Sequence, residues 1–163
     1  MNNKSIKSGC LTYKVYEDTV VIERADAEIL PQHLTIPSTL TSNGETYTVT
    51  SIGEWAFSDC DELKGITIPD SVTEIGNNAF LRCKSLESIT IPNSVTEIGN
   101  GAFCECISLK IVDIPNSVTE IGYGAFAGCD NLAEVNIPAS DKAFPLWVRI
   151  MESKNVDPIL ALV

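Results

Sequence analysis

The chain has 163 residues, of which 22 are acidic and 11 are basic, and its formal net charge is -11. This charge excludes a protein that tracks nucleic-acid phosphates and one that docks on an anionic membrane surface, because both need a basic surface. The hydrophobic content of 44% argues against a disordered chain and suits one domain with a sizeable core.

No apolar run approaches the roughly 20 residues that span a bilayer, so we expect no membrane insertion. The first five residues, Met1–Ser5, lead into no apolar segment of the kind that a secretory signal contains. We therefore expect a cytoplasmic protein if the chain is complete, and an extracellular or cell-surface protein if a signal has been removed.

The N-terminal region predicts two β-hairpins. Leu11–Tyr16 and Thr19–Ile22 are strand-like and flank a short polar turn. His33–Pro37 then imitates a strand that recurs farther along the chain. Asn43 followed by Gly44 is a strong tight-turn signal and predicts a second, smaller hairpin. We assign residues 1–47 to an N-terminal β-hairpin cap with a partial repeat.

Residues 48–139 contain a repeat with a period of 23 residues. The four units are Thr48–Asp70, Ser71–Asn93, Ser94–Asn116 and Ser117–Ala139. Aromatic, thiol and aliphatic positions recur in register in all four units: Phe57, Phe80, Phe103 and Phe126; Cys60, Cys83, Cys106 and Cys129; Ile52, Ile75, Ile98 and Ile121; Leu63, Leu86, Leu109 and Leu132. So many matching positions cannot arise from composition alone, and they indicate a repeat architecture.

Each unit predicts a strand, a corner, a second short extended stretch and one helical turn. In the second unit, Ile89–Ile91 alternates like a strand, and Pro92 ends it because proline has no N–H donor. Gly76 supplies a flexible corner, and Asn77–Cys83 is interpreted as a single helical turn. One unit cannot bury its apolar side chains alone, so stacking predicts a solenoid with parallel strands about 4.8 Å apart.

After Ala139 the repeat stops, and residues 140–163 are assigned to a helical C-terminal cap. Pro145 suits a first helical position, and Trp147, Ile150 and Met151 can share one helical face. The helix covers the last unit or, alternatively, docks on a partner. Ile159–Val163 is a second apolar run, which packs under the cap or marks where a longer protein was cut.

The repeat resembles a known family. The shared pattern, IG..AF..C..L..I.IP..V.., is carried in the second unit by Ile75, Gly76, Ala79, Phe80, Cys83, Leu86, Ile89, Ile91 and Pro92, followed by Val95. It is similar to the BspA-like class of bacterial leucine-rich repeats over Thr48–Ala139, with Gly9–Tyr47 as the lead-in. The resemblance implies a β-rich leucine-rich repeat superhelix with parallel strands and short helical turns. It also implies a surface-exposed bacterial protein that adheres to host or matrix proteins.

The residues that could carry chemistry are interpreted as structural. The four cysteines of the repeat predict a ladder of buried, reduced thiols, whereas Cys10 and Cys104 are expected to be accessible. A parallel stack does not converge on a tetrahedral ion, so no metal site is predicted. His33 is the only histidine, and no serine elbow, P-loop or dinucleotide fingerprint occurs. We therefore predict no catalytic site and no cofactor.

An acidic column is the first candidate binding surface. Its members repeat at the same place in three units, beside a column of threonines: Glu74, Glu97 and Glu120. Like charges on neighbouring strands destabilise slightly, so the column does not serve stability alone. It could attract a basic partner, hold a loosely bound cation or simply form a solvated face.

The outward face of the longer strands is the second candidate surface, because its residues vary between units while the framework repeats. The first outward column reads Lys64, Glu87, Lys110 and Ala133, the second Gly65, Ser88, Ile111 and Glu134, and the third Thr67, Thr90, Asp113 and Asn136. The first column predicts charge pairs between strands. Repeat proteins recognise partners through such surfaces. The candidate contacts are Lys64, Glu87, Ser88, Lys110, Ile111, Asp113, Glu134 and Asn136, although Ile111 is also acceptable as a neutral surface residue.

The sequence favours a non-enzymatic, monomeric protein-binding module of a bacterial cell surface or secreted protein. The alternative is an intracellular adaptor or inhibitor that binds a basic protein, which free thiols and the absence of a signal would suit. A carbohydrate-binding or hydrolytic enzyme is disfavoured, because we identify neither an aromatic platform nor an acid/base pair.

Overall fold

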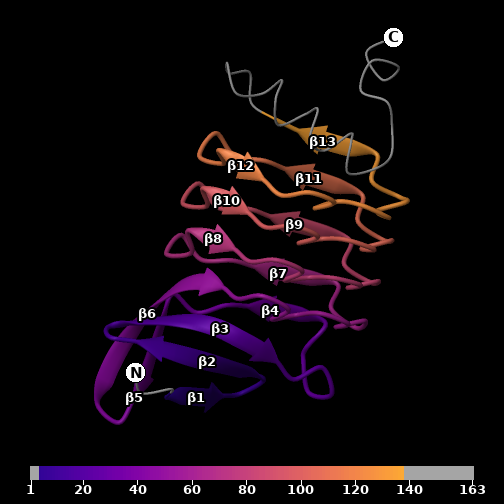
Figure 1. Cartoon of the computed structure of the whole chain (residues 1–163). Coiled ribbons are helices and arrows are strands. Elements are labelled where there is room, and N and C mark those ends of the chain that lie inside the picture. Colours follow the sequence, from indigo (N-terminus) through magenta and orange to yellow (C-terminus); the bar gives the residue numbers. More distant parts are fainter. Residues whose placement is uncertain (1–3, 138–163) are drawn as a thin grey trace.

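The computed structural model describes residues 4–137 as a stack of similar rungs with two sheets on different sides (Figure 1). The helical cap, the docking helix and the apolar run considered for 140–163 lie outside the described residues. The larger sheet contains β1 (Ser5–Ser8), β2 (Leu11–Tyr16), β3 (Thr19–Ala25), β5 (Thr39–Ser42), β6 (Glu45–Ile52), β8 (Glu74–Ile75), β10 (Glu97–Ile98) and β12 (Glu120–Ile121). The smaller sheet contains β4 (His33–Thr35), β7 (Gly65–Thr67), β9 (Ser88–Thr90), β11 (Ile111–Asp113) and β13 (Glu134–Asn136).

Both expected hairpins are present at the N-terminal end. Strands β2 and β3 pair antiparallel, and β5 and β6 do the same around a turn in which Asn43 and Gly44 have φ of 53° and 83°. These left-handed angles explain the Asn-Gly pair. Strand β3 also pairs in parallel with β6, so the first hairpin continues the larger sheet, in the order β1-β2-β3-β6-β8-β10-β12. Strand β1 was not predicted, because its four residues alternate too briefly to be recognised.

The repeat period is the register of both sheets. In the larger sheet Ile52, Ile75, Ile98 and Ile121 are successive partners in parallel pairs. In the smaller sheet, ordered β13-β11-β9-β7-β4, partners 23 residues apart likewise face each other. Each unit therefore forms one rung, which confirms the solenoid of parallel strands. The division of the chain at residues 47 and 139 stays a prediction.

The helical turn expected in each unit is wrong. The segment forms consecutive turns with left-handed residues four apart: Trp55 and Asp59, then Asn78 and Arg82, then Gly101 and Glu105, then Gly124 and Gly128. A right-handed helix cannot continue through such residues. The amides of these residues in the first three units donate instead to carbonyls of the following rung, as Trp55 N does to Asn77 O at 3.1 Å and Asp59 N to Leu81 O at 2.8 Å. Helices are absent throughout the part of the chain that the structure describes, and accordingly no membrane-spanning helix is found there.

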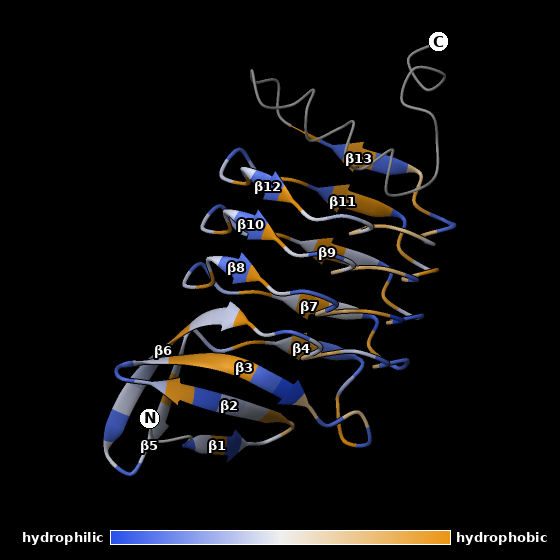
Figure 2. Cartoon of the chain, viewed as in Figure 1, coloured by the Kyte–Doolittle hydropathy of each residue, from blue (hydrophilic) through white to orange (hydrophobic). Residues whose placement is uncertain are grey.

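The core lies between the sheets and the turn segments, where hydrophobic residues recur at equal heights (Figure 2). The rings of Phe57, Phe80, Phe103 and Phe126 stack with centroid separations of 5.0, 5.2 and 5.3 Å. All four are fully buried. This ladder of rings joins each rung to the next through both dispersion and offset stacking.

The cysteine ladder runs beside the phenylalanines and confirms the prediction of buried, free thiols. The Sγ atoms of Cys83, Cys106 and Cys129 donate to the phenylalanine carbonyl of the preceding rung at 3.0, 3.1 and 3.0 Å. Burial raises the pKa of the ladder thiols. The pKa of Cys60 rises to about 11, and the pKa values of Cys83 and Cys106 rise further. The thiols of Cys83 and Cys106 are therefore neutral hydrogen-bond donors to buried carbonyls.

Candidate functional site

The smaller sheet presents a regular outward face built from three columns. In β9 and β11 the central residue is buried and both neighbours are exposed, as period-two alternation requires. Ser88, Ile111 and Glu134 are direct register partners, so the second predicted column is a continuous row across three strands. Ile111 is 43% exposed at the centre of this row. It is the apolar centre of an otherwise polar surface.

The first column forms the charge pair that the alternating signs predict. Lys110 Nζ lies 3.0 Å from Glu87 Oε2 in an exposed ion pair. The hydrogen bond from Lys110, with contributions from Lys64 and His33, holds the pKa of Glu87 below its usual value. Such an exposed pair contributes little stability. Its effect is to orient two charged side chains next to Ile111.

His33 begins this face on the edge strand β4. Its ring lies over Gly65, its register partner, where an added Cβ would come within 2.8 Å of His33 Nδ1. Gly65 follows His33 in the row that contains Ser88 and Ile111, and the imidazole fills the space that a side chain at Gly65 would need. His33 has a structural explanation at this position.

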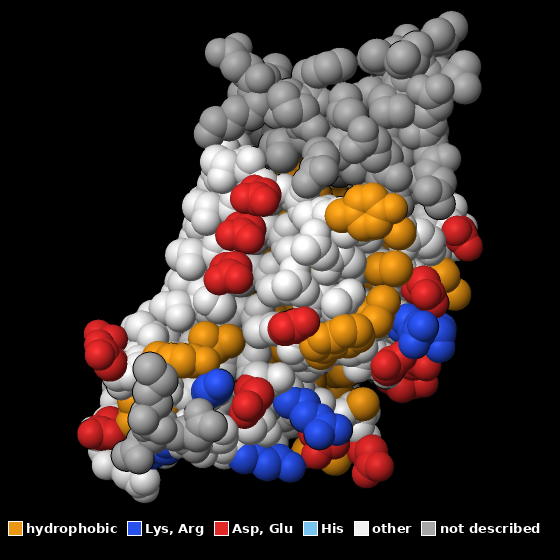
Figure 3. Space-filling model, viewed as in Figure 1, with side chains coloured by type: hydrophobic (Ala, Val, Ile, Leu, Met, Phe, Trp, Pro, Cys, Tyr) orange, Lys and Arg blue, Asp and Glu red, His pale blue; other side chains and the backbone are white. Residues whose placement is uncertain are grey.

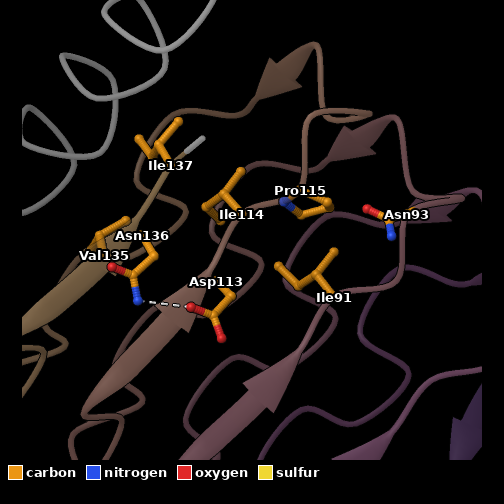
Figure 4. Close-up of a pocket in the computed structure, with 8 residues that line it drawn as sticks. All are labelled: Ile91, Asn93, Asp113, Ile114, Pro115, Val135, Asn136 and Ile137. Carbon is orange, nitrogen blue, oxygen red and sulfur yellow. Dashed lines mark hydrogen bonds between the residues drawn. The ribbon is translucent and has the colours of Figure 1, made fainter. Parts of the chain in front are cut away.

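Asp113 and Asn136 lie at the rim of a pocket of about 500 Å³ near the ends of β11 and β13 (Figure 4). Asn136 Nδ2 donates to Asp113 Oδ1 at 2.8 Å and to Glu134 Oε1 at 3.1 Å, so one amide is shared by two carboxylates. The apolar part of the lining comes from Ile91, Ile114, Pro115, Val135 and Ile137. The pocket gives this face a concave, partly apolar end.

The acidic column lies on the other sheet. Glu97 is the register partner of both Glu74 and Glu120, and Figure 3 shows a row of acidic side chains over β8, β10 and β12. Neighbouring parallel strands are about 4.8 Å apart, and each pair of like charges at that distance costs roughly 1 kcal/mol in water before salt screening. The neighbouring threonines do not compensate this charge, because Thr73, Thr96 and Thr119 donate to carbonyls of the preceding rung.

The structure thus divides the predicted contacts between two faces. Eight of them lie on or beside the smaller sheet, whereas Glu74, Glu97 and Glu120 lie on the larger one. Within the described range, no cluster of three or more His, Cys, Asp or Glu side chains could hold a metal ion. Cys10 and Cys104 are partly exposed, unlike the four thiols of the ladder.

The turn segments carry exposed residues that the sequence reasoning did not select. Trp55 is 51% exposed and Tyr123 is 79% exposed, and Figure 3 shows apolar side chains on this side of the stack. Arg82 also connects three rungs here, with Nε 3.1 Å from Glu105 Oε2 and an Nη atom 4.0 Å from Asp59 Oδ1. The sequence does signal both residues, because each differs from its equivalents in the other units. Trp55 stands where later units have asparagine or glycine, and Tyr123 stands where two other units have asparagine.

Comparison with known proteins agrees with this architecture. The model of the BspA type leucine-rich repeat region matches residues 32–147 with six copies. The chain belongs to this family. Leucine-rich repeat modules generally mediate protein interactions. No curated protein matches the chain.

Solved structures with the same fold come from several bacteria. A leucine-rich repeat protein from Bacteroides capillosus is 30% identical, with a TM-score of 0.73, and the match covers 81% of this chain and 96% of that one. One from Bacteroides ovatus is 33% identical, with a TM-score of 0.65, covering 82% of this chain and 41% of that one. The T. pallidum leucine-rich repeat protein is 26% identical, with a TM-score of 0.58, covering 82% of each chain.

Proposed function

We propose that this chain is a non-enzymatic protein-binding module of a bacterial cell-surface or secreted protein, and that the outward face of the smaller sheet contacts the partner. The protein acts as a monomer in this role. The family supports a protein-interaction module, and the BspA resemblance supports recognition of host or matrix proteins.

The observation that carries the proposal is the contrast between inward and outward columns of the smaller sheet. The inward positions Ile66, Ile89 and Val112 are all buried, β-branched aliphatic residues. The outward row changes from Ser88 to Ile111 between neighbouring rungs, although both side chains are exposed. Stacking of the rungs requires buried aliphatic residues at the inward positions. It does not restrict the residues of the outward row, which are therefore available for recognition.

The polar surroundings of Ile111 suit a protein contact. Lys110 and Glu87 form an oriented ion pair on one side, and Asp113 with Asn136 border the concave end on the other. An apolar centre within a polar rim is the usual anatomy of a protein interface. The acidic column is on a separate face, where its field would speed the approach of a basic partner without contacting it.

The test is capture of proteins from host-cell surface and extracellular-matrix extracts by the immobilised chain. Ile111→Ser gives this rung the residue of the neighbouring rung, so the fold is retained. We expect this variant to lower affinity about 10-fold, as loss of a central interface residue does. Ile107→Ser is the matched control, since Ile107 is 39% exposed on a turn segment. Equal capture by both variants would contradict the assignment of the face.

A second candidate is an intracellular adaptor or inhibitor of a basic protein. The six free cysteines and the aligned column of Glu74, Glu97 and Glu120 favour it, because free thiols persist in a reducing compartment. Fractionation of the native host separates the two candidates. Protein found only in the cytosol would exclude the surface role, and salt-sensitive capture lost on reversal of the three glutamates would support the adaptor.

A further inference from the structure

A crevice separates the N-terminal hairpin from the turn segment of the first rung. Its volume is about 690 Å³, and its charged and aromatic lining comprises Lys7, Arg24, Asp26, Glu28, Trp55 and Asp59. The crevice lies where the turn segment of a preceding rung would be if the repeat continued. The hairpin fills only the middle of that place, where Ala25 N donates to Ala56 O at 2.6 Å. The equivalent bond one rung later runs from Phe57 N to Ala79 O.

Because the hairpin replaces only part of a preceding turn segment, one backbone carbonyl in the crevice lacks the hydrogen bond that its equivalents accept. In the later rungs the carbonyls of Leu81, Cys104 and Ala127 each accept a hydrogen bond from the preceding rung, at 2.8, 2.8 and 2.7 Å. Ser58 occupies the same column and lines the crevice, but its carbonyl accepts no backbone hydrogen bond within residues 4–137. The crevice therefore offers an acceptor that the fold satisfies everywhere else.

Trp55 stands at the edge of the crevice in an unusual conformation. Its φ is 61°, in a column where the other members are Asn78, Gly101 and Gly124. Asparagine and glycine tolerate this left-handed region, whereas a bulky residue there is strained. The indole is half exposed, and its Nε1 donates to Glu54 Oε1 at 3.0 Å. Packing does not account for a half-exposed tryptophan at this place, and residues with unfavourable backbone angles cluster at binding sites.

The charges around the crevice are mixed. Lys7 Nζ pairs with Asp26 Oδ2 at 3.2 Å. The side chains of Arg24 and Glu28 make no ion pair with any other described residue, so one free donor group and one free acceptor group remain. Opposite signs do not select a strongly charged ligand. An extended peptide strand is blocked as well, because the Ala25 amide already occupies the central acceptor.

We propose that this crevice binds a neutral saccharide unit, whose apolar ring face rests on Trp55 and whose hydroxyl groups bond to Arg24, Glu28 and the Ser58 carbonyl. A sugar hydroxyl both donates and accepts, which matches a lining of separate donors and acceptors beside an aromatic face. Trp55 supplies the aromatic platform that was not recognised in the sequence. The site is separate from the smaller-sheet face, so its failure would leave the proposed protein-binding function standing.

The test is saturation-transfer NMR on the full chain with neutral oligosaccharides of glucose, galactose, mannose and N-acetylglucosamine, each at about 10 mM. We expect at least one of them to bind, and Trp55→Gly to lower its affinity at least about 10-fold. This variant should fold, because Gly101 and Gly124 hold the same place in later rungs. Arg24→Ala should weaken binding in the same way, with amide NMR spectra confirming the fold of both variants.

Tyr123→Asn is the matched control, since it removes an exposed aromatic residue from another turn segment and restores the asparagine of its column. We expect it to bind the sugar as the unaltered chain does. The proposal is overturned if none of the oligosaccharides binds, if binding survives Trp55→Gly, or if Tyr123→Asn abolishes it. The proposal would also be overturned if a charged peptide shifted the amide signals around the crevice while none of the oligosaccharides did.

Discussion

Replacing a central ring of the phenylalanine ladder tests whether contacts between rungs hold the fold together. Phe103 is fully buried and stacks on two rings, Phe80 at 5.2 Å and Phe126 at 5.3 Å. Phe57 is equally buried but, among residues 4–137, stacks on one ring only, that of Phe80 at 5.0 Å. Phe103→Ala and Phe57→Ala therefore remove the same side chain with a different number of ring partners.

Truncation of a buried phenylalanine to alanine costs about 3–5 kcal/mol, and each stacked pair contributes roughly 0.5–1.5 kcal/mol within that loss. We expect Phe103→Ala to lie at the upper end of this range and Phe57→Ala to cost about 1 kcal/mol less. Since a domain of this kind is stable by about 5–15 kcal/mol, either change removes a large fraction of the total.

The assay is urea-induced unfolding, followed by circular dichroism and by tryptophan fluorescence. Coincident transitions would justify a single free energy of unfolding for each variant. A loss below about 2 kcal/mol for Phe103→Ala would contradict the described core. A larger loss for Phe57→Ala than for Phe103→Ala would refute the argument from stacking.

Three other predictions concern backbone and polar contacts. Ser94 Oγ donates to Val72 O at 2.6 Å, whereas Ser117 Oγ is buried without a partner among the described residues. In the same urea assay, Ser94→Ala should therefore cost about 1 kcal/mol of unfolding free energy, and Ser117→Ala should be neutral or stabilising. Gly99→Ala should lower the melting temperature by several degrees, because its Cβ would come within 2.6 Å of a backbone nitrogen of the preceding rung. Because burial raises the pKa of Cys60 from 9.0 to about 11, the folded state keeps a proton that the unfolded chain releases, and the free energy of unfolding should fall as the pH rises from 9 through 11. Cys60→Ala should make that fall shallower, and an unchanged slope would count against burial as its source.

The stacked architecture could be predicted from the sequence because the period itself encodes the register. Residues that recur every 23 positions can only be equivalent if each unit makes the same contacts with the next. The N-terminal hairpins were also predictable, since Asn43-Gly44 and the alternation in Leu11–Tyr16 act locally. The conformation of the turn segments could not be predicted. A helical turn and consecutive turns with left-handed residues four apart have similar short apolar patterns. The distinction depends on hydrogen bonds to the next rung, as between Phe57 N and Ala79 O.

The candidate site was predictable in part. The outward columns follow from strand alternation, and the pairing of Lys110 with Glu87 follows from the repeat. The crevice beside Trp55 could not be foreseen, because it depends on how far the hairpin replaces a missing rung. The sequence did carry a local sign of it, a tryptophan in a column of asparagine and glycine.

The assignment of the partner face is tested most directly by site-specific photo-crosslinking. A benzophenone amino acid is placed at Ile111 in one variant and at Glu97, on the other sheet, in a second. The same captured partner is then offered to both variants. We predict a covalent adduct from position 111 and none from position 97. An adduct from position 97 alone would contradict the assignment and place the partner on the acidic column.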